Sequence, residues 1–254
     1  MEIFYITTLF ILGTILGSFY NVVGYRLPKG ESIIYPPSHC PNCKKKLSPK
    51  ELIPIFSFLL SKGKCIHCKE KISPFYLLFE LITGILFVLA YLSYGLTPDL
   101  LIALTFISML IIIVISDYLY MIINDRVLGF FGIVLIIEIT VIYGPIVLLK
   151  HILSGLLAFT TMFLLKKLGD FLFKKESMGG GDIKLMFIFG LVMGYPMSIL
   201  SIFLGSLVGL PLSLITLNKN QQHIIPFGPF LAIGAVIIIL LQLDLDIIVN
   251  FLYK

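Results

Sequence analysis

Long apolar runs are the feature that most restricts the fold of this sequence. A helix needs about 20 consecutive apolar residues to cross a bilayer, and several runs approach that length. Of the 254 residues, 58% are hydrophobic and only 13% are charged, whereas about a quarter of the residues in a soluble domain are charged. We therefore predict an all-α polytopic membrane protein. Eight spans are expected, at residues 3–23, 75–94, 100–116, 127–143, 146–165, 183–193, 197–217 and 230–249.

The positions of Lys and Arg predict how these spans are oriented. Positive residues gather on the cytoplasmic side of membrane proteins. With eight spans, 17 of the 19 Lys and Arg residues fall on the same side as segment 26–73, and only Lys150 and Lys254 fall on the other. We expect this segment in the cytoplasm and both termini outside. Because no small-residue cleavage site ends the first apolar run, we expect that run to be retained as a helix.

Segment 26–73 contains all four cysteines, as two C-x-x-C pairs separated by 21 residues. Two such pairs can place four thiolates around one tetrahedral zinc ion. A structural metal would fold a loop that is too short to bury a core of its own. His67 is a rival ligand, but four cysteines already complete the site. We predict structural Zn²⁺ bound by Cys40, Cys43, Cys65 and Cys68, and three regions: a first transmembrane helix (1–25), a cytoplasmic zinc-binding module (26–73) and a seven-helix membrane catalytic domain (74–254).

A glycine-rich polar stretch at residues 178–184, Met-Gly-Gly-Gly-Asp-Ile-Lys, interrupts the apolar runs and contains Asp182. The ordinary interpretation of this carboxylate is a cap on the following helix. A catalytic interpretation needs a second carboxylate, and Asp117 ends the expected third span at the same membrane surface. Two carboxylates that share a proton can activate water against a peptide carbonyl, one as general base and the other as a proton donor to the carbonyl oxygen. Asp117 and Asp182 are therefore the candidate catalytic pair.

Other acidic residues have simpler explanations. Asp125 begins the expected fourth span, where an acidic residue interacts favourably with the helix dipole. Glu80 falls inside the second span and needs a polar partner or a cavity. Glu138 falls toward the outer half of the fourth span. We expect Asp170 and Glu176 to be solvated. Three other carboxylates are expected on the side of the membrane away from Asp117 and Asp182: Asp99, Asp244 and Asp246.

Several motifs follow one another along nearly the whole chain. They are Gly-Ser-Phe-x-Asn-Val-Val-x-Tyr-Arg-Leu-Pro at 17–28, Ser-His-Cys-Pro-x-Cys at 38–43, Ile-Pro-Ile-Phe-Ser at 53–57, Gly-Lys-Cys-x-x-Cys-x-x-x-Ile-Ser at 63–73, Gly-x-Gly-Asp-x-Lys at 179–184 and Pro-Phe-Gly-Pro-Phe-Leu-Ala-x-Gly at 226–234. Together, and in this order, they resemble the prepilin peptidase family, the type IV prepilin leader peptidases/N-methyltransferases.

The resemblance implies an aspartyl protease of the bacterial cytoplasmic membrane. Such an enzyme removes the basic leader of a type IV prepilin or pseudopilin after a glycine, at the cytoplasmic face. Many members then methylate the new N-terminus with S-adenosylmethionine. Carried over by position, the catalytic residues are Asp117 and Asp182. Supporting roles would fall to Gly179, Gly181, Lys184 and Asp125.

Two positions qualify this resemblance. Asn124 stands where the family usually has the proline of an Ile-Pro-Asp sequence, and this change weakens a helix-start signal. Gly63 matches a glycine that the family associates with methyl transfer, but a turn glycine leading into the second cysteine pair explains it equally simply. Lys184 is either a neighbour of the catalytic pair or one more cationic anchor at the membrane surface.

Two other functions compete with a peptidase. A transporter could use the two aspartates to bind ions or protons, although transporters usually place such sites near the middle of the bilayer. A scaffold of an envelope assembly could use the zinc module for docking and the aspartates as caps. We expect prepilin or pseudopilin substrates and the lipid bilayer as partners, and no nucleic acid.

Overall fold

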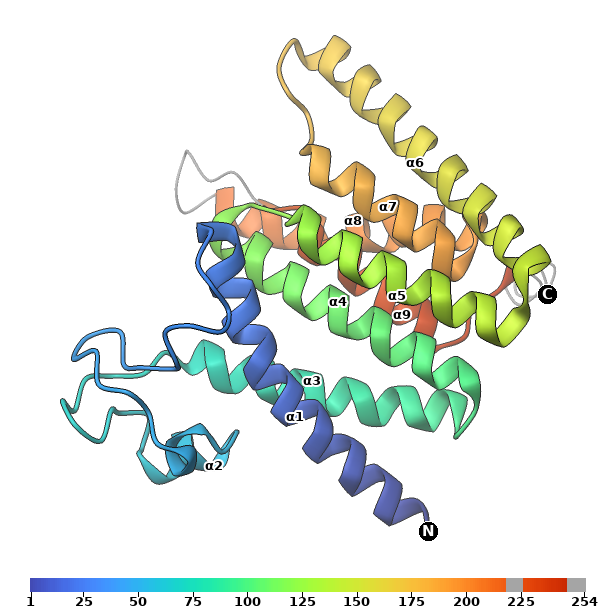
Figure 1. Ribbon diagram of the computed structural model, residues 1–254. Helices are drawn as coiled ribbons and strands as arrows, with labels where there is room; N and C mark the ends of the chain where they lie inside the picture. Colours follow the sequence, from blue (N-terminus) through green and yellow to red (C-terminus); the bar gives the residue numbers. More distant parts are fainter. Residues whose placement is uncertain (218–225, 246–254) are drawn as a thin grey trace. The chain divides into compact units, whose positions relative to one another are not determined.

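The computed structural model describes residues 1–217 and 226–245, and these residues form helices joined by loops (Figure 1). The chain divides into two compact units, an N-terminal unit (Met1–Leu92) and a C-terminal unit (Ser93–Lys254). The described residues contain no β-sheet, only the isolated bridges His39–Lys46 and Lys64–Lys71 within the cysteine pairs. The predicted all-α fold is confirmed for these residues. The division into 1–25, 26–73 and 74–254 stays a prediction.

The N-terminal unit contains two long helices with a polar segment between them. Helix α1 (Glu2–Arg26) continues into the 3₁₀ turn η1 (Leu27–Lys29). Helix α3 (Pro74–Tyr94) follows the polar segment. The two helices are joined where Asn21 donates from its amide to the Tyr76 carbonyl oxygen at 3.2 Å. The polar segment forms only two short helical elements, η2 (Pro49–Leu52) and α2 (Phe56–Leu60).

The described part of the C-terminal unit contains six helices, and α4 is the most deeply buried of its membrane-length helices. The six helices are α4 (Pro98–Tyr120), α5 (Asp125–Tyr143), α6 (Pro145–Phe173), α7 (Gly180–Met193), α8 (Tyr195–Leu217) and α9 (Gly228–Leu240). Helix α4 packs against α5 and α9, while α6 packs along α7 and α8 along α9 (Figure 1). Phe106, Ile107 and Ile113 of α4 are completely buried. Because α4 is enclosed by its neighbours, a polar residue on it is held in a fixed position.

Among the described residues, five helices are long and apolar enough to cross a membrane: Glu2–Lys29, α3, α4, α5 and α6. This finding supports a multi-pass membrane protein. The last three expected spans correspond to α7, α8 and α9, of which α7 has 14 residues and α9 has 13. Residues 246–249 of the eighth expected span lie outside the described residues. The number of eight spans stays a prediction.

Candidate active site and metal centre

Asp117 lies in the last turn of α4, three residues before the helix ends at Tyr120. We expected the helix to end at this residue, but it continues to Tyr120 and closes at Met121, whose left-handed backbone donates its N–H to the Asp117 carbonyl oxygen at 2.8 Å. The side chain is only 6% exposed. The backbone N–H of Gly228, at the start of α9, donates to Asp117 Oδ2 at 3.0 Å. Helices α4 and α9 thus position this carboxylate together.

Asp182 occupies the third position of α7, which begins after Gly179. The backbone N–H of Gly179 interacts with the Asp182 carboxylate, as a carboxylate at this position does in a capping box. The capping interpretation is therefore partly correct. It does not account for the whole side chain, because Asp182 is only 7% exposed and its Oδ1 has no hydrogen-bond partner among the described residues. Capping occupies only part of the carboxylate.

The two carboxylates approach each other within the C-terminal unit. They are close enough for a direct Coulombic interaction. Ile123, in the α4–α5 loop, lies beside two glycines of this site: Gly181, next to Asp182 in the sequence, and Gly228, which contacts Asp117. A Cβ atom added to Gly181 would be 2.6 Å from Ile123 Cβ, and one added to Gly228 would be 2.6 Å from Asp117 Oδ2 and 3.4 Å from Ile123 Cδ1. The first turns of α7 and α9 reach this point only because glycine has no side chain there.

Gly228 and Ile123 lie next to the two carboxylates, but neither was predicted as a site residue from the sequence. Gly228 belongs to the Pro-Phe-Gly-Pro motif at 226–229, so its motif was the available signal. Nothing in the sequence pattern marks Ile123, since it is one apolar residue among many. Two buried carboxylates in one apolar site are a suitable pair for acid–base catalysis when they share one proton.

Lys184 and Asp125 bind each other at the edge of this site. Lys184 Nζ contacts both carboxylate oxygens of Asp125, at 2.7 and 2.8 Å. Both side chains are more than half exposed, and the pair connects the first turns of α7 and α5. Asn124 begins α5 by accepting a hydrogen bond from the Arg126 N–H at 2.9 Å. The expectation that Asn124 weakens this helix start is therefore wrong, because asparagine is among the best N-cap residues.

Three further acidic side chains have partners of their own. Glu80 Oε2 accepts the Ile55 N–H at 2.8 Å within the N-terminal unit. Glu138 Oε1 accepts the Thr105 hydroxyl at 2.8 Å, and its Oε2 is buried without a partner in the described structure. Asp170 accepts both the N–H and the hydroxyl of Ser177.

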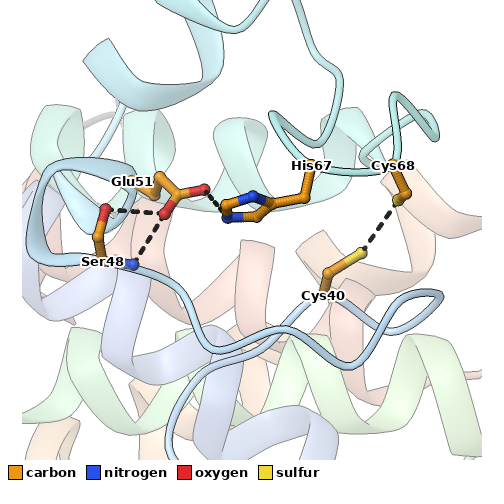
Figure 2. Close-up of polar contacts among 5 residues, drawn as sticks. All are labelled: Cys40, Ser48, Glu51, His67 and Cys68. Carbon is orange, nitrogen blue, oxygen red and sulfur yellow. Dashed lines mark hydrogen bonds and ion pairs between the residues drawn. The ribbon is translucent and has the colours of Figure 1, made fainter.

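The four cysteines form one cluster in the N-terminal unit. Their sulfur atoms all lie within 4.8 Å of one another, and Cys40 Sγ is 3.8 Å from Cys68 Sγ (Figure 2). Four thiolates about 2.3 Å from a tetrahedral zinc ion would be about 3.8 Å apart. Cys40 and Cys65 are buried and Cys43 and Cys68 are more accessible, so the four sulfur atoms surround one point at the edge of the segment. The cluster therefore fits zinc.

His67 points away from this cluster, although it lies between Cys65 and Cys68 in the sequence. Its Nε2 faces Glu51 Oε1 at 3.5 Å (Figure 2). Glu51 in turn accepts the Ser48 N–H and hydroxyl, at 2.8 and 2.7 Å. These hydrogen bonds lower the pKa of Glu51. His67 thus connects the second cysteine pair to η2.

Gly63 precedes the second cysteine pair in a left-handed conformation, with φ of +68°. Its carbonyl oxygen accepts the Ile72 N–H at 2.8 Å. These observations support the turn interpretation of Gly63, and a role in methyl transfer stays a prediction.

The N-terminal unit also contains a cavity of about 1300 Å³ next to the cysteine cluster. Arg26, Tyr25 and Tyr76 line it, together with several lysines. Ligand pockets commonly have volumes of about 300–1,000 Å³. The cavity is therefore larger than a typical small-molecule pocket.

Sequence comparisons identify the family. The profile of the Bacterial Peptidase A24 N-terminal domain matches residues 11–94, and that of the Type IV leader peptidase family matches residues 104–214. The chain is 37% identical over 252 residues to the "Prepilin leader peptidase/N-methyltransferase" of Bacillus subtilis (strain 168), covering 98% of each chain. The chain belongs to the type IV leader peptidase family. The expected resemblance is thereby confirmed.

More distant relatives have the same or similar names. The "Prepilin leader peptidase/N-methyltransferase" of Neisseria gonorrhoeae is 29% identical, over 90% of this chain and 87% of the relative. The "Type 4 prepilin-like proteins leader peptide-processing enzyme" of Escherichia coli O78:H11 is 30% identical, over 91% of each chain. No solved structure matches the chain significantly. The matched C-terminal profile contains both Asp117 and Asp182, and the N-terminal one contains the cysteine cluster.

Proposed function

We propose that the protein cleaves the leader of type IV prepilins or pseudopilins, with Asp117 and Asp182 as its catalytic carboxylates. Family membership and the names of relatives support the peptidase activity. The observation that carries the residue assignment is the convergence of two buried carboxylates, from α4 and α7, in one site of the C-terminal unit. Membership of this family favours a peptidase over the transporter and the scaffold.

The geometry supports two different roles for the carboxylates of this pair, one as a general base and the other as a general acid. An ionised carboxylate takes a proton from water while the protonated partner donates a hydrogen bond to the scissile carbonyl. Water then adds to the carbonyl carbon, the C–N bond breaks, and the leaving nitrogen receives a proton. The Gly228 N–H fixes the orientation of Asp117, and in this proposal Asp182 Oδ1 is the oxygen that contacts water or substrate when the site opens to the prepilin.

The site faces the cytoplasm in this proposal. Residues 26–73 carry ten of the nineteen Lys and Arg residues, and such a concentration belongs on the cytoplasmic side. With eight spans in a bacterial cytoplasmic membrane, both termini lie outside. The zinc-binding module and the ends of α4 and α7 that carry Asp117 and Asp182 then lie at the inner face.

Zinc has a structural role in the proposal. Cys40, Cys43, Cys65 and Cys68 would hold Zn²⁺, and four thiolates leave no open position for a reacting water. The metal would supply folding free energy to a segment with little core. Two cysteine residues, Cys40 and Cys65, are buried, so the site forms an interior for this segment.

N-methylation is the second candidate activity, favoured by the relatives' names and by the 1300 Å³ cavity of the N-terminal unit. S-adenosylmethionine, when bound, supplies the methyl group for the new N-terminus. The cavity residues Tyr25, Tyr76 and Arg26 would bind and orient it. Gly63 would shape the loop beside it.

Cleavage of a co-expressed prepilin in membranes tests the assignment of the catalytic pair. Asp117→Asn and Asp182→Asn should each abolish cleavage, since asparagine cannot transfer the proton. Glu138→Gln is the matched control, because Glu138 is also a partly unpaired carboxylate of the C-terminal unit, and it should cleave normally. Normal cleavage by either aspartate variant would contradict the assignment. The mass of the product also reveals whether its N-terminus is methylated.

A further inference from the structure

The short helix α2 turns an apolar face outward. Phe56, Leu59 and Leu60 are three and four residues apart, so they share one side of the helix. Leu52 and Ile53 precede them, and all five side chains are between 42% and 85% exposed. We call these five residues the α2 surface. Phe58, on another side of the helix, packs over Gly63. A helix in contact with water normally has its apolar face inward, so this surface indicates a binding face.

A partly buried hydrogen bond fixes where the α2 surface lies along the N-terminal unit. Ile55, which directly precedes α2, donates its N–H to Glu80 Oε2 at 2.8 Å. Glu80 is 8% exposed and belongs to α3, a helix long and apolar enough to span a membrane. Glu80 is six residues past the first residue of α3, or about 9 Å along the helix axis. The start of α2 is therefore held beside the second turn of a membrane-spanning helix.

If α3 begins at the membrane surface, this distance of about 9 Å matches the position of an interfacial helix. Such helices bury their apolar face about 5–10 Å into the boundary between headgroups and acyl chains. Cations border the α2 surface on both sides in the sequence, with Lys50 before it and Lys62 and Lys64 after it, all exposed. Segment 26–73 as a whole contains ten cations and three carboxylates. Lysines at this level attract lipid phosphates.

We infer that the α2 surface docks on the phospholipid bilayer as an interfacial helix whose depth is set by the Glu80–Ile55 hydrogen bond. A second copy of the chain or the apolar helix of a pilin would also cover these side chains. The bilayer is favoured over both, because α2 is attached to a helix long enough to span the membrane and exposed lysines flank the α2 surface.

A single tryptophan can test this inference, because the chain contains none. Leu60→Trp places the reporter on the most exposed residue of the α2 surface, and Glu70→Trp places a control on an exposed polar position of the second cysteine pair. Each full-length variant is reconstituted into phospholipid vesicles with and without brominated acyl chains. We expect blue-shifted emission from the Leu60 reporter and loss of most of it to the brominated lipid, with red-shifted and largely unquenched emission from the control.

Further outcomes would overturn the inference or test its second part. Red-shifted, unquenched emission at both positions would mean that the α2 surface faces water. Blue-shifted emission at position 60 without quenching by the brominated lipid would mean that protein covers it. Equal quenching at both positions would contradict docking by this surface in particular. In the Leu60→Trp chain, Glu80→Leu should reduce the quenching and Glu80→Gln, which keeps an acceptor, should retain it. Unchanged quenching in Glu80→Leu would contradict the role of Glu80.

Discussion

At the scale of single residues, Asp182 combines a structural and a chemical role. Its carboxylate interacts with the Gly179 N–H at the start of α7, while Oδ1 is buried without a partner in the described structure. An unsatisfied buried polar atom costs about 1–3 kcal/mol. A simple cap at a helix start does not require this cost, because it can remain in water. The Gly179 contact therefore accounts for one part of the carboxylate, and the proposed catalytic role uses the other.

The glycines beside Asp182 allow a matched pair of substitutions. A Cβ at Gly181 would be 2.6 Å from Ile123 Cβ, whereas one at Gly180 would have no neighbour within 4 Å. Gly181→Ala should move the first turn of α7 and reduce cleavage by on the order of 10²-fold, because small displacements of catalytic groups have effects of that size. Gly180→Ala should cleave normally. Rates of prepilin cleavage in membranes provide the measurement.

Shortening the opposing side chain checks the cause of this loss. In the Gly181→Ala/Ile123→Ala variant the new methyl group has room, so a large part of the activity should return. If Gly180→Ala is as inactive as Gly181→Ala, flexibility of the glycine-rich stretch and not the contact with Ile123 controls catalysis.

At the scale of helices, the Asp125–Lys184 pair connects the starts of α5 and α7. Both side chains are largely exposed, and exposed ion pairs contribute about 0.2–1 kcal/mol. Asp125→Asn and Lys184→Gln should therefore each leave substantial cleavage activity and lower stability by less than about 1 kcal/mol. Cleavage rates and thermal unfolding of the purified variants measure these effects. Complete loss of cleavage in Asp125→Asn alone would identify Asp125 as a catalytic acid.

The start of α5 supports a second prediction at this scale. Asn124 accepts the Arg126 N–H, so Asn124→Ala should lower the free energy of unfolding by about 1 kcal/mol, the usual cost of losing an N-cap. Asn124→Asp preserves the acceptor and should retain the stability of the original chain. Thermal unfolding of the three proteins compares them. An alanine variant as stable as the original would show that the cap contributes nothing.

The helices could be predicted from the sequence more reliably than their ends. The apolar runs located α3 and α5 closely, because a run of apolar residues must be helical in a bilayer. The start of α6 was also located, but this helix continues to Phe173, beyond the expected end at residue 165. The end of α4 was misplaced because Asp117 looked like a boundary, whereas the helix ends at the left-handed Met121. The cysteine cluster followed from its spacing. The contact of Gly228 with Asp117 joins residues 111 positions apart, and no local pattern predicts such a contact.

At the scale of the whole molecule, the two compact units are built on different principles. The C-terminal unit buries long apolar side chains around α4. The segment between α1 and α3 has no comparable core, and its described contacts come from the two cysteine pairs, from Glu51 and from the Glu80 hydrogen bond. Damage to the metal site should therefore affect one unit and leave the packing of the other intact.

Removal of the metal ligands tests this difference between the units. Cys40→Ser should lose bound zinc and make residues 26–73 sensitive to protease, because metal binding supplies the folding free energy of such a segment. Residues Ser93–Leu217 should remain protected, since their core lies within the C-terminal unit.

His67→Ala is the matched control for the loss of zinc. The His67 ring contacts Glu51, and the sulfur cluster consists of the four cysteines, so this variant should still bind one zinc ion per protein molecule. Zinc content by mass spectrometry and limited proteolysis provide the two readouts. Loss of zinc in His67→Ala would make histidine a ligand, and protection of 26–73 in metal-free Cys40→Ser would show that this segment folds without the metal.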